Sequence, residues 1–387
     1  DDVVFAFADR GTGPTDHREA HNVYGLLMAR ATYEGLRQLR DERPFLLTRA
    51  CFAGSQRYAA AWTGDNVSTW EHLLLSLRIC QSLSLSGLAF CGPDIGGFAG
   101  QPSPELYARW MQAGVLYPFM RTHYSHEESE QQEPWSFGEE VEGISRRYLQ
   151  LRYRLLPTIY SAFEACTRTA EPPLKALLLE HPDDPNVHRG CDDQMYLGPT
   201  LMACPVTTAG ARQREVYFPA VDGAWTDVWT GEAIDGGQTV SVAAPLDTMP
   251  LYGRAGGGVA LDPPRLHTQD GEPETLTLWA FPGQGTSSFY FDDWISYAHE
   301  SVDWFRLHID LDGTAARVRR DGDRGLRGYR QLEWRFPLSA CGDVHSVTVD
   351  GVEVPLAASL DGDTSAARGG PWLYVRTRTD VETVTIG

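Results

Sequence analysis

The sequence predicts an α/β segment followed by an all-β segment: the C-terminal half of a (β/α)8 TIM barrel, then two β-sandwich-like domains. In the first part of the chain, short apolar runs alternate with amphipathic stretches, which is typical of strand–loop–helix units in a parallel sheet. Further along, helical periodicity fades, and short alternating segments lie between Gly, Pro, Asp and Thr, as in antiparallel β domains. The 387 residues are enough for two or three hydrophobic cores.

This change in pattern divides the chain into three predicted domains. Residues 1–171 form the half barrel, residues 172–262 a proximal C-terminal β domain, and residues 263–387 a distal C-terminal β domain. The second boundary is placed at Pro263-Pro264. Four strands are only half of a barrel, so closure needs strands from elsewhere, for which the sequence before Asp1 is the natural source.

Within the half barrel, the apolar runs predict strands at residues 44–49, within 58–65, at 87–91 and at 116–120. A helix is expected after Ser68 or Thr69, either of which can cap it. A long helix is expected from about residue 141 to 167, tolerating or kinking at Pro157.

Composition excludes several classes of partner. The formal net charge of −19 argues against nucleic acid, and no apolar run approaches the roughly 20 residues that span a bilayer. The seven cysteines include no CxxC pair, which argues against a zinc ribbon or a thioredoxin-like motif. Scattered thiols of this kind favour a reducing compartment, and we expect a cytoplasmic protein.

Polar residues recur where the apolar strands end. Arg49, Asp65, Asp94, Arg121 and His123 all lie at or just beyond the carboxyl ends of predicted strands. In a (β/α)8 barrel this is the face on which the active site is built, with one or two side chains from each strand. The sequence therefore predicts a site formed by these five residues.

Asp65 is the candidate for acid/base chemistry. A glycosidase needs a carboxyl group that stays protonated near neutral pH and can protonate the departing oxygen. Trp62, three residues earlier, offers apolar surroundings and a face on which a sugar can stack. An Asp after Gly64 is also an ordinary cap or turn residue, so the motif by itself leaves both readings open.

The other candidates also have more than one interpretation. Arg49 suits sugar hydroxyls or a carboxylate, or forms a structural ion pair. Asp94, in a glycine-rich loop without the Lys-Ser/Thr of a P-loop, is either a bidentate acceptor for sugar hydroxyls or a turn residue. Arg121 and His123 place two donors two residues apart, and His123 can be a donor, a general base or a core histidine.

Two further motifs contain residue types that bind metal ions. His17 and His21 have the i, i+4 spacing of a zinc pair on a helix, although the order is not that of an H-E-x-x-H motif. Asp292 and Asp293 are either calcium ligands or a paired turn. We expect an ordinary packing helix and a turn, and hence no metal and no cofactor. No G-x-S-x-G motif supports a serine hydrolase.

Several motifs occur together, in an order that resembles glycoside hydrolase family 31. The resemblance is dense over roughly residues 17–260 and faint in the last hundred. No single motif is specific, whereas their joint order is. The motifs are HNVYG at 21–25, RPFLLTR at 43–49, FAGSQRY at 52–58, WTGDN at 62–66, GPDIGGF at 92–98, YPFMRTH at 117–123, LRYRLLP at 151–157 and PLD at 245–247.

The resemblance implies a role for each site residue. Asp65 stands at the position of the family's general acid/base, and Trp62 lines the subsite of the non-reducing sugar. Phe98 walls the pocket. Substrate-contacting positions are occupied by Arg49, Asp94, Arg121 and His123. The family's barrel followed by proximal and distal β domains also agrees with the three-part organisation.

The chain departs from the family at the nucleophile. The family's nucleophile is an Asp in a Trp-x-Asp-Met-Asn-Glu-like segment on an earlier strand, and no such segment occurs in these 387 residues. Asp1-Asp2 does not match it. Two smaller departures are Val67, where some members carry an aromatic, and Trp294, which replaces the glycine of an Asp-Asp-Gly-x-Ser-Tyr-like turn.

The resemblance therefore predicts a retaining α-glucosidase that acts on α-glucoside oligosaccharides by double displacement, with this chain supplying the acid/base half of the site. The N-terminal half of the same enzyme, as a separate chain or a missing segment, is the expected partner. Another activity of the family, such as an α-xylosidase or an α-glucan lyase, is the alternative among enzymes. A non-catalytic carbohydrate-binding subunit or fragment is the alternative from another class.

Overall fold

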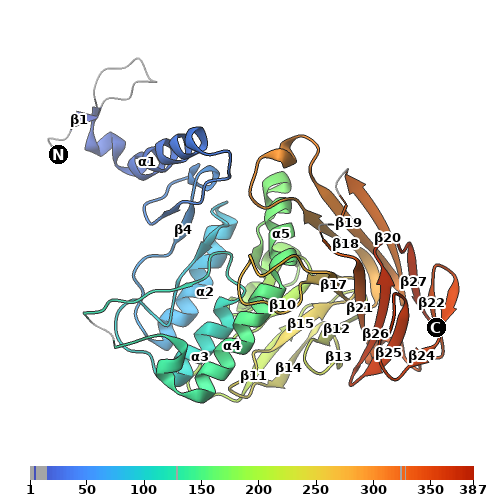
Figure 1. Ribbon diagram of the computed structural model, residues 1–387. Helices are drawn as coiled ribbons and strands as arrows, with labels where there is room; N and C mark the ends of the chain where they lie inside the picture. Colours follow the sequence, from blue (N-terminus) through green and yellow to red (C-terminus); the bar gives the residue numbers. More distant parts are fainter. Residues whose placement is uncertain (1–3, 6–14, 128–129, 323–324, 327) are drawn as a thin grey trace.

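The computed structural model describes residues 4–5, 15–127, 130–322, 325–326 and 328–387. Asp1-Asp2 lie outside the described residues. The chain passes from a helical part through a central group of strands to a second β region that ends at the C-terminus (Figure 1). This is the mixed order that the sequence predicts: barrel-type units first, and sheets afterwards.

The half barrel contains short parallel strands. Strand β3 pairs with β4, and β4 pairs with β5, in a three-stranded parallel sheet, while β6 pairs in parallel with β7. Pro93, which has no backbone N–H to donate, separates β5 from β6. The bounds are Leu47–Thr48 for β3, Ala60–Trp62 for β4, Cys91–Gly92 for β5, Asp94–Ile95 for β6 and Arg121–Thr122 for β7.

Five helices accompany these strands. Thr69 caps α2 through its Oγ1 atom, which accepts a hydrogen bond from the His72 amide at 3.3 Å, so one of the two predicted caps is confirmed. Ser103 caps α3 in the same way, with Pro104 in the first turn. The bounds are His17–Leu39 for α1, Trp70–Leu85 for α2, Pro104–Gly114 for α3, Glu139–Arg154 for α4 and Leu156–Thr169 for α5.

The predicted long helix is two helices that meet at Leu155. Pro157 lies in the first turn of α5, where a missing N–H costs nothing because the first amides of a helix have no intrahelical partner. The proline therefore begins a new helix instead of kinking a continuous one.

The predicted strand at residues 116–120 is wrong. Leu116 and Tyr117 form the turn that ends α3, with their amides bonded to the carbonyls of Ala113 and Gly114. Arg152 on α4 donates to the carbonyls of Val115, Tyr117 and Pro118 at 2.6–3.0 Å. A short buried apolar run has the same pattern in a strand and in a turn packed against a helix, so periodicity did not distinguish them.

The central β region contains one six-stranded sheet in the order β13-β12-β15-β10-β9-β8 and a separate ribbon of β11 and β14. All of its pairings are antiparallel. The bounds are Leu174–Ala176 for β8, Met195–Leu197 for β9, Leu201–Ala203 for β10, Gln213–Phe218 for β11, Ala224–Asp227 for β12, Ala233–Asp235 for β13, Gln238–Ala243 for β14 and Leu251–Arg254 for β15.

The last β region contains two six-stranded sheets whose apolar faces share one core. The first sheet comprises β16 (Gly258–Leu261), β17 (Thr275–Ala280), β21 (Gln331–Pro337), β26 (Trp372–Arg378), β25 (Ser365–Gly369) and β24 (Leu356–Ala357). The second comprises β18 (Gly283–Phe291), β19 (Phe305–Gly313), β20 (Ala315–Gly322), β27 (Thr383–Ile386), β22 (Val347–Val349) and β23 (Val352–Val354).

Outside these groups, the structure has a short pairing of β1 (Val4–Phe5) with β2 (Thr15–Asp16) and two four-residue helices, α6 (Leu177–Glu180) and α7 (Leu338–Cys341). Within the described residues, no helix combines the length and the apolar character that a membrane crossing requires.

Arg109 on α3 joins the half barrel to the central β region. Its guanidinium donates to the carbonyls of Ala211, Ala244, Pro245 and Thr248 at 2.7–3.1 Å, and none of the residue is exposed. Burial lowers the pKa of Arg109 to about 10, so the group remains a cation near neutral pH. Since backbone carbonyls, not carboxylates, compensate this buried charge, the two parts of the chain depend on each other.

We predict that Arg109→Met lowers the free energy of unfolding by about 3 kcal/mol or more, because it leaves several buried carbonyls without a donor. Urea titration followed by circular dichroism measures this loss.

The matched control is Arg212→Ala, which removes a half-exposed ion pair with Glu105 in the same area. That change should stay within about 1 kcal/mol. An equal loss in both variants would contradict the role assigned to Arg109.

Candidate active site

The predicted site residues lie at or near the ends of the short parallel strands. Trp62 ends β4, and Asp65 follows three residues later. Arg49 directly follows β3, whereas Asp94 begins β6 and Arg121 begins β7. Parallel pairing sets Thr48 beside Ala61 in one sheet and Asp94 beside Arg121 in another.

Asp94 and Arg121 form a buried ion pair. Nε of Arg121 donates to Oδ1 of Asp94 at 2.6 Å, and the Asp94 side chain has no exposed surface. Burial raises the pKa of Asp94 above its ordinary value, while the Arg121 guanidinium and, more weakly, His123 oppose this shift. The Arg121 guanidinium also lies 4.9 Å from the ring centre of Trp62.

Three buried polar atoms of this group have no hydrogen-bond partner within the described part of the chain: Oδ2 of Asp94, Nη2 of Arg121 and Nε1 of Trp62. One is an acceptor and two are donors. Leaving a buried polar group unsatisfied costs about 1–3 kcal/mol. A ligand rich in hydroxyl groups can satisfy both kinds of atom, since each hydroxyl both donates and accepts.

Asp65 and Arg49 form a second and more open pair. Nη1 of Arg49 lies 3.6 Å from Oδ2 of Asp65, and their side chains are 64% and 48% exposed, respectively. An acid catalyst needs surroundings that disfavour its charged form. In this chain, solvent reaches the side chain of Asp65.

Phe98 and His123 lie with their ring centres 5.3 Å apart. The Phe98 amide donates to Oδ1 of Asn66 at 2.9 Å, and Nδ2 of Asn66 donates to the carbonyl of Asp94 at 2.9 Å. The residue beside Asp65 therefore holds both the Asp94 backbone and the loop that carries Phe98.

Sequence reasoning missed two positioning residues, Asn66 and Gln132. Asn66 belongs to the motif that contains Asp65, so the motif marks its position. Its hydrogen bonds to the backbone of Asp94 and Phe98 are not visible in the sequence. Nε2 of Gln132 donates to the carbonyls of Gly97 and Gly100 at 3.2 and 3.3 Å. No motif marks Gln132, because its role depends on a loop from a distant part of the sequence.

Gly97 explains why the loop at residues 96–98 requires glycine. Its φ angle is +94°, and a Cβ atom there would lie 2.5 Å from the amide nitrogen of Ser68. Both the backbone conformation and the close approach exclude a side chain. The glycine-rich segment therefore packs a loop against the start of α2.

The side chains of the two motifs considered for metal binding contact other residues of the chain. Nδ1 of His21 lies 2.7 Å from Nε2 of His17. Asp292 accepts hydrogen bonds from Arg43 and Tyr160, and Asp293 accepts them from the Ile295 and Ser296 amides. No group of three or more His, Cys, Asp or Glu side chains suited to a metal occurs among the described residues.

Two family models match consecutive parts of the sequence. Residues 5–162 match the glycosyl hydrolases family 31 TIM-barrel domain, and residues 170–257 match the glycosyl hydrolase family 31 C-terminal domain. The chain belongs to glycoside hydrolase family 31. This confirms the resemblance seen in the motifs.

The curated relatives include α-glucosidases. The chain is 41% identical over 356 residues to "Alpha-glucosidase 2" of Bacillus thermoamyloliquefaciens, a match that covers 89% of this chain and 44% of that protein. It is 42% identical over 246 residues to "Neutral alpha-glucosidase AB" of Homo sapiens, covering 63% of this chain and 26% of that protein. This family 31 chain thus spans less than half the length of either relative.

Solved structures agree on the fold. A Flavobacterium johnsoniae GH31 dextranase complexed with glucose superimposes with a TM-score of 0.84 at 27% identity, over 97% of this chain and 49% of that one. A GH31 α-xylosidase from Xanthomonas citri gives a TM-score of 0.77 at 31% identity, over 83% and 37%. The barrel-derived domain followed by β domains is therefore shared with these members of the family.

We predict that Arg121→Met lowers the free energy of unfolding by about 3 kcal/mol near neutral pH, because it leaves the Asp94 carboxylate buried without its cation. A carboxyl group whose pKa is raised in the folded state destabilises the fold as pH rises through its unfolded and then its folded pKa. Removing Arg121 raises the pKa of Asp94 further, so the loss should shrink at mildly acidic pH. Urea unfolding at the two pH values tests this.

The control combines Arg121→Met with Asp94→Asn, which removes the titrating group. In that background the pH dependence of the loss should disappear. A loss with the same pH dependence in both backgrounds would show that Asp94 is not its source.

Proposed function

We propose that this chain supplies the acid/base half of the active site of a retaining α-glucosidase, which hydrolyses terminal non-reducing α-linked glucose from oligosaccharides. The observation that carries the proposal is the set of unpartnered buried atoms on Trp62, Asp94 and Arg121, beside the Asp65–Arg49 pair. A sugar ring supplies hydroxyl groups for all three. The names of the curated relatives support glucose as the sugar.

The proposed reaction has two displacements. Asp65 protonates the glycosidic oxygen as a carboxylate nucleophile attacks the anomeric carbon, and it then deprotonates the water that hydrolyses the glycosyl-enzyme. Retention requires the two carboxyl groups to lie about 5–5.5 Å apart. The proposed nucleophile belongs to a segment outside these 387 residues, since the Trp-x-Asp-Met-Asn-Glu-like segment is not among them.

The proposed partner is the N-terminal half of the same enzyme. Among the described strands, β3 pairs only with β4, and β7 pairs only with β6, so one edge of each strand remains free to extend a sheet. The exposure of Asp65 and Arg49 supports the same view, because added strands would cover the site. One similar structure is an ER glucosidase II heterodimeric complex of a catalytic subunit and the binding domain of a regulatory subunit.

We also propose the domain division at residues 171 and 262, with two β-sandwich-like C-terminal domains. An apolar cluster within each of the central and last β regions supports two units, and a further cluster joins both regions to the barrel helices. Strand β16 (Gly258–Leu261) already belongs to the last region, which favours a boundary a few residues earlier. A cytoplasmic location is proposed from the seven cysteines, none of which forms a disulfide among the described residues.

An α-xylosidase is the second candidate, and the similarity to the Xanthomonas citri enzyme supports it. The two activities differ in whether the pocket accommodates the C6 hydroxymethyl group of glucose. Relative rates on p-nitrophenyl α-glucoside and α-xyloside distinguish them.

The test uses a chimaera in which this chain replaces the matching segment of the Bacillus thermoamyloliquefaciens enzyme, so that a nucleophile is present. Asp65→Asn in this chimaera should lower kcat on maltose by about 10²–10⁴-fold, the usual contribution of a general acid or base. Melting temperature should change little, because Asp65 is half exposed.

A glucosyl substrate with a better leaving group makes the readout specific to the acid role. α-Glucosyl fluoride needs no protonation to depart, so Asp65→Asn should slow the first displacement much less on this substrate than on maltose. Equal losses of kcat/KM, which reports the first displacement, on both substrates would assign Asp65 to binding or structure, and turnover close to that of the parent would exclude it from catalysis.

A further inference from the structure

Three side chains on neighbouring strands of the last β region form a hydrogen-bonded line. Oγ of Ser288 on β18 lies 2.7 Å from Nδ1 of His308 on β19. Nε2 of the same imidazole lies 2.8 Å from Oδ2 of Asp321 on β20. Strand register brings them together, because Ser288 and His308 are directly opposite each other in the antiparallel β18–β19 pair.

The order of these contacts defines the direction in which a proton can move. A carboxylate only accepts, so Nε2 of His308 carries the proton that is donated to Asp321. In the neutral tautomer that carries its proton on Nε2, Nδ1 is the lone-pair nitrogen and accepts from the Ser288 hydroxyl. A neutral imidazole that faces a hydroxyl on one side and a carboxylate on the other is the arrangement that activates a serine nucleophile.

The hydrogen bonds of His308 to Ser288 and Asp321 coexist with a neighbouring ion pair. Arg319, which faces His308 across the β19–β20 pair, forms two hydrogen bonds with Asp310, at 2.5 and 2.9 Å. The Arg319 guanidinium is thus hydrogen-bonded to Asp310, and Asp321 is the hydrogen-bond partner of His308. The imidazole has 15% of its side chain exposed, whereas Asp321 has 58% of its side chain exposed, so the carboxylate end of the line is open to water.

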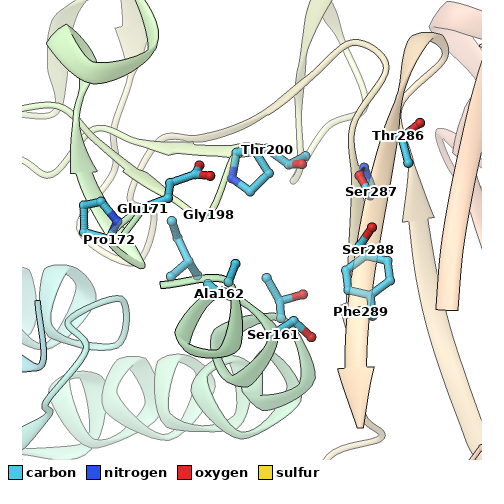
Figure 2. Close-up of a pocket in the computed structure, with 15 residues that line it drawn as sticks. Ser161, Ala162, Glu171, Pro172, Gly198, Thr200, Thr286, Ser287, Ser288 and Phe289 are labelled. Carbon is cyan, nitrogen blue, oxygen red and sulfur yellow. Dashed lines mark hydrogen bonds between the residues drawn. The ribbon is translucent and has the colours of Figure 1, made fainter. Parts of the chain in front are cut away.

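Ser288 also borders a cavity. A hollow of about 190 Å³ lies between α5, the β9–β10 turn and β18. Figure 2 shows Ser288 and its strand facing Ser161 and Ala162 on the helix, with Glu171 and Thr200 on the remaining side. Much of the lining is small and apolar, which suits a short acyl chain better than a sugar ring. None of the seven residues assigned to the sugar site lines this cavity.

We propose that Ser288 is an activated nucleophile and that Ser288, His308 and Asp321 form a second reactive site, which accepts short acyl groups from activated esters. Oγ of Ser288 attacks the ester carbonyl, and the bond to the leaving alkoxide or phenoxide breaks as the new ester bond forms. His308 takes the serine proton and passes it to the leaving oxygen. Water then hydrolyses the acyl-serine, which releases the carboxylic acid and restores the hydroxyl.

The position of Ser288 within a strand sets the rate of this chemistry. In α/β hydrolases the nucleophile lies on a sharp turn next to backbone amides that stabilise the oxyanion. One such donor contributes about 10²–10³-fold in rate. Ser288 lies in the middle of β18 instead, so we expect fast reaction only with good leaving groups, and deacylation slow enough for the acyl-enzyme to accumulate.

The experiment incubates the whole 387-residue chain with p-nitrophenyl acetate, follows p-nitrophenolate release, and maps the acetylated residue by peptide mass spectrometry. We expect a burst close to one equivalent and acetyl on Ser288. His308→Gln retains a side chain that can bond to the serine but removes the base, so it should slow acetylation of Ser288 by about 100-fold. Asp321→Asn, at a positioning residue, should slow it less.

Gln284→Ala is the matched control. Gln284 lies on the same strand, donates to the Asp312 carboxylate at 3.3 Å, and does not line the cavity. This variant should acetylate Ser288 at the parent rate.

If Ser288, His308 and Asp321 only stabilise the sheet, the acetylation experiment gives a different result. Acetyl spread over many residues of the unmodified chain, or Ser288 acetylation at an equal rate with His308→Gln, would overturn the proposal. Mapping of the acetylated residue on the unmodified chain tests the proposal even where a variant does not fold. No outcome depends on glycosidase activity, so the two proposals fail separately.

Discussion

The burial of the Asp94 carboxyl group is the constraint on which the rest of the half-barrel site depends. A carboxylate with no exposed surface needs a cation, and among the described residues Arg121 on the next strand forms an ion pair with it. Once its Nε is bonded to Asp94, the guanidinium lies against Trp62. The pair thus fixes the relative positions of three strand ends and leaves the second oxygen of Asp94 without a partner in the described chain.

Elements behind the site hold this arrangement in place. Arg152 on α4 binds the three carbonyls that precede β7, which fixes the turn from which Arg121 emerges. Arg109 on α3 binds four carbonyls of the central β region. Side chains of the barrel helices and of the β regions share one apolar cluster. The β domains therefore contribute to the site indirectly, by supporting the helices that position its strands.

The sequence predicted that Asp65 and Asp94 follow parallel strands, and they follow β4 and β5. Arg121 instead begins β7, so its ion pair with Asp94 did not follow from the predicted strands. The catalytic and binding roles of these residues stay predictions. Residues 116–120 were assigned wrongly because burial, not strand pairing, explains their apolar character. The contacts of Gln132, and the line through Ser288 and His308, depend on register between segments far apart in sequence, which no local pattern encodes.

The measurement that tests the central claim most directly is the anomeric form of the glucose released from maltose by the chimaeric enzyme, followed by NMR as hydrolysis proceeds. The account predicts that α-glucose forms first and then mutarotates, because two displacements at the anomeric carbon retain its configuration. Initial β-glucose would show a single displacement and contradict the role of Asp65 as an acid/base in a retaining mechanism. A folded chimaera that releases no glucose would contradict the claim that this chain completes an α-glucosidase site.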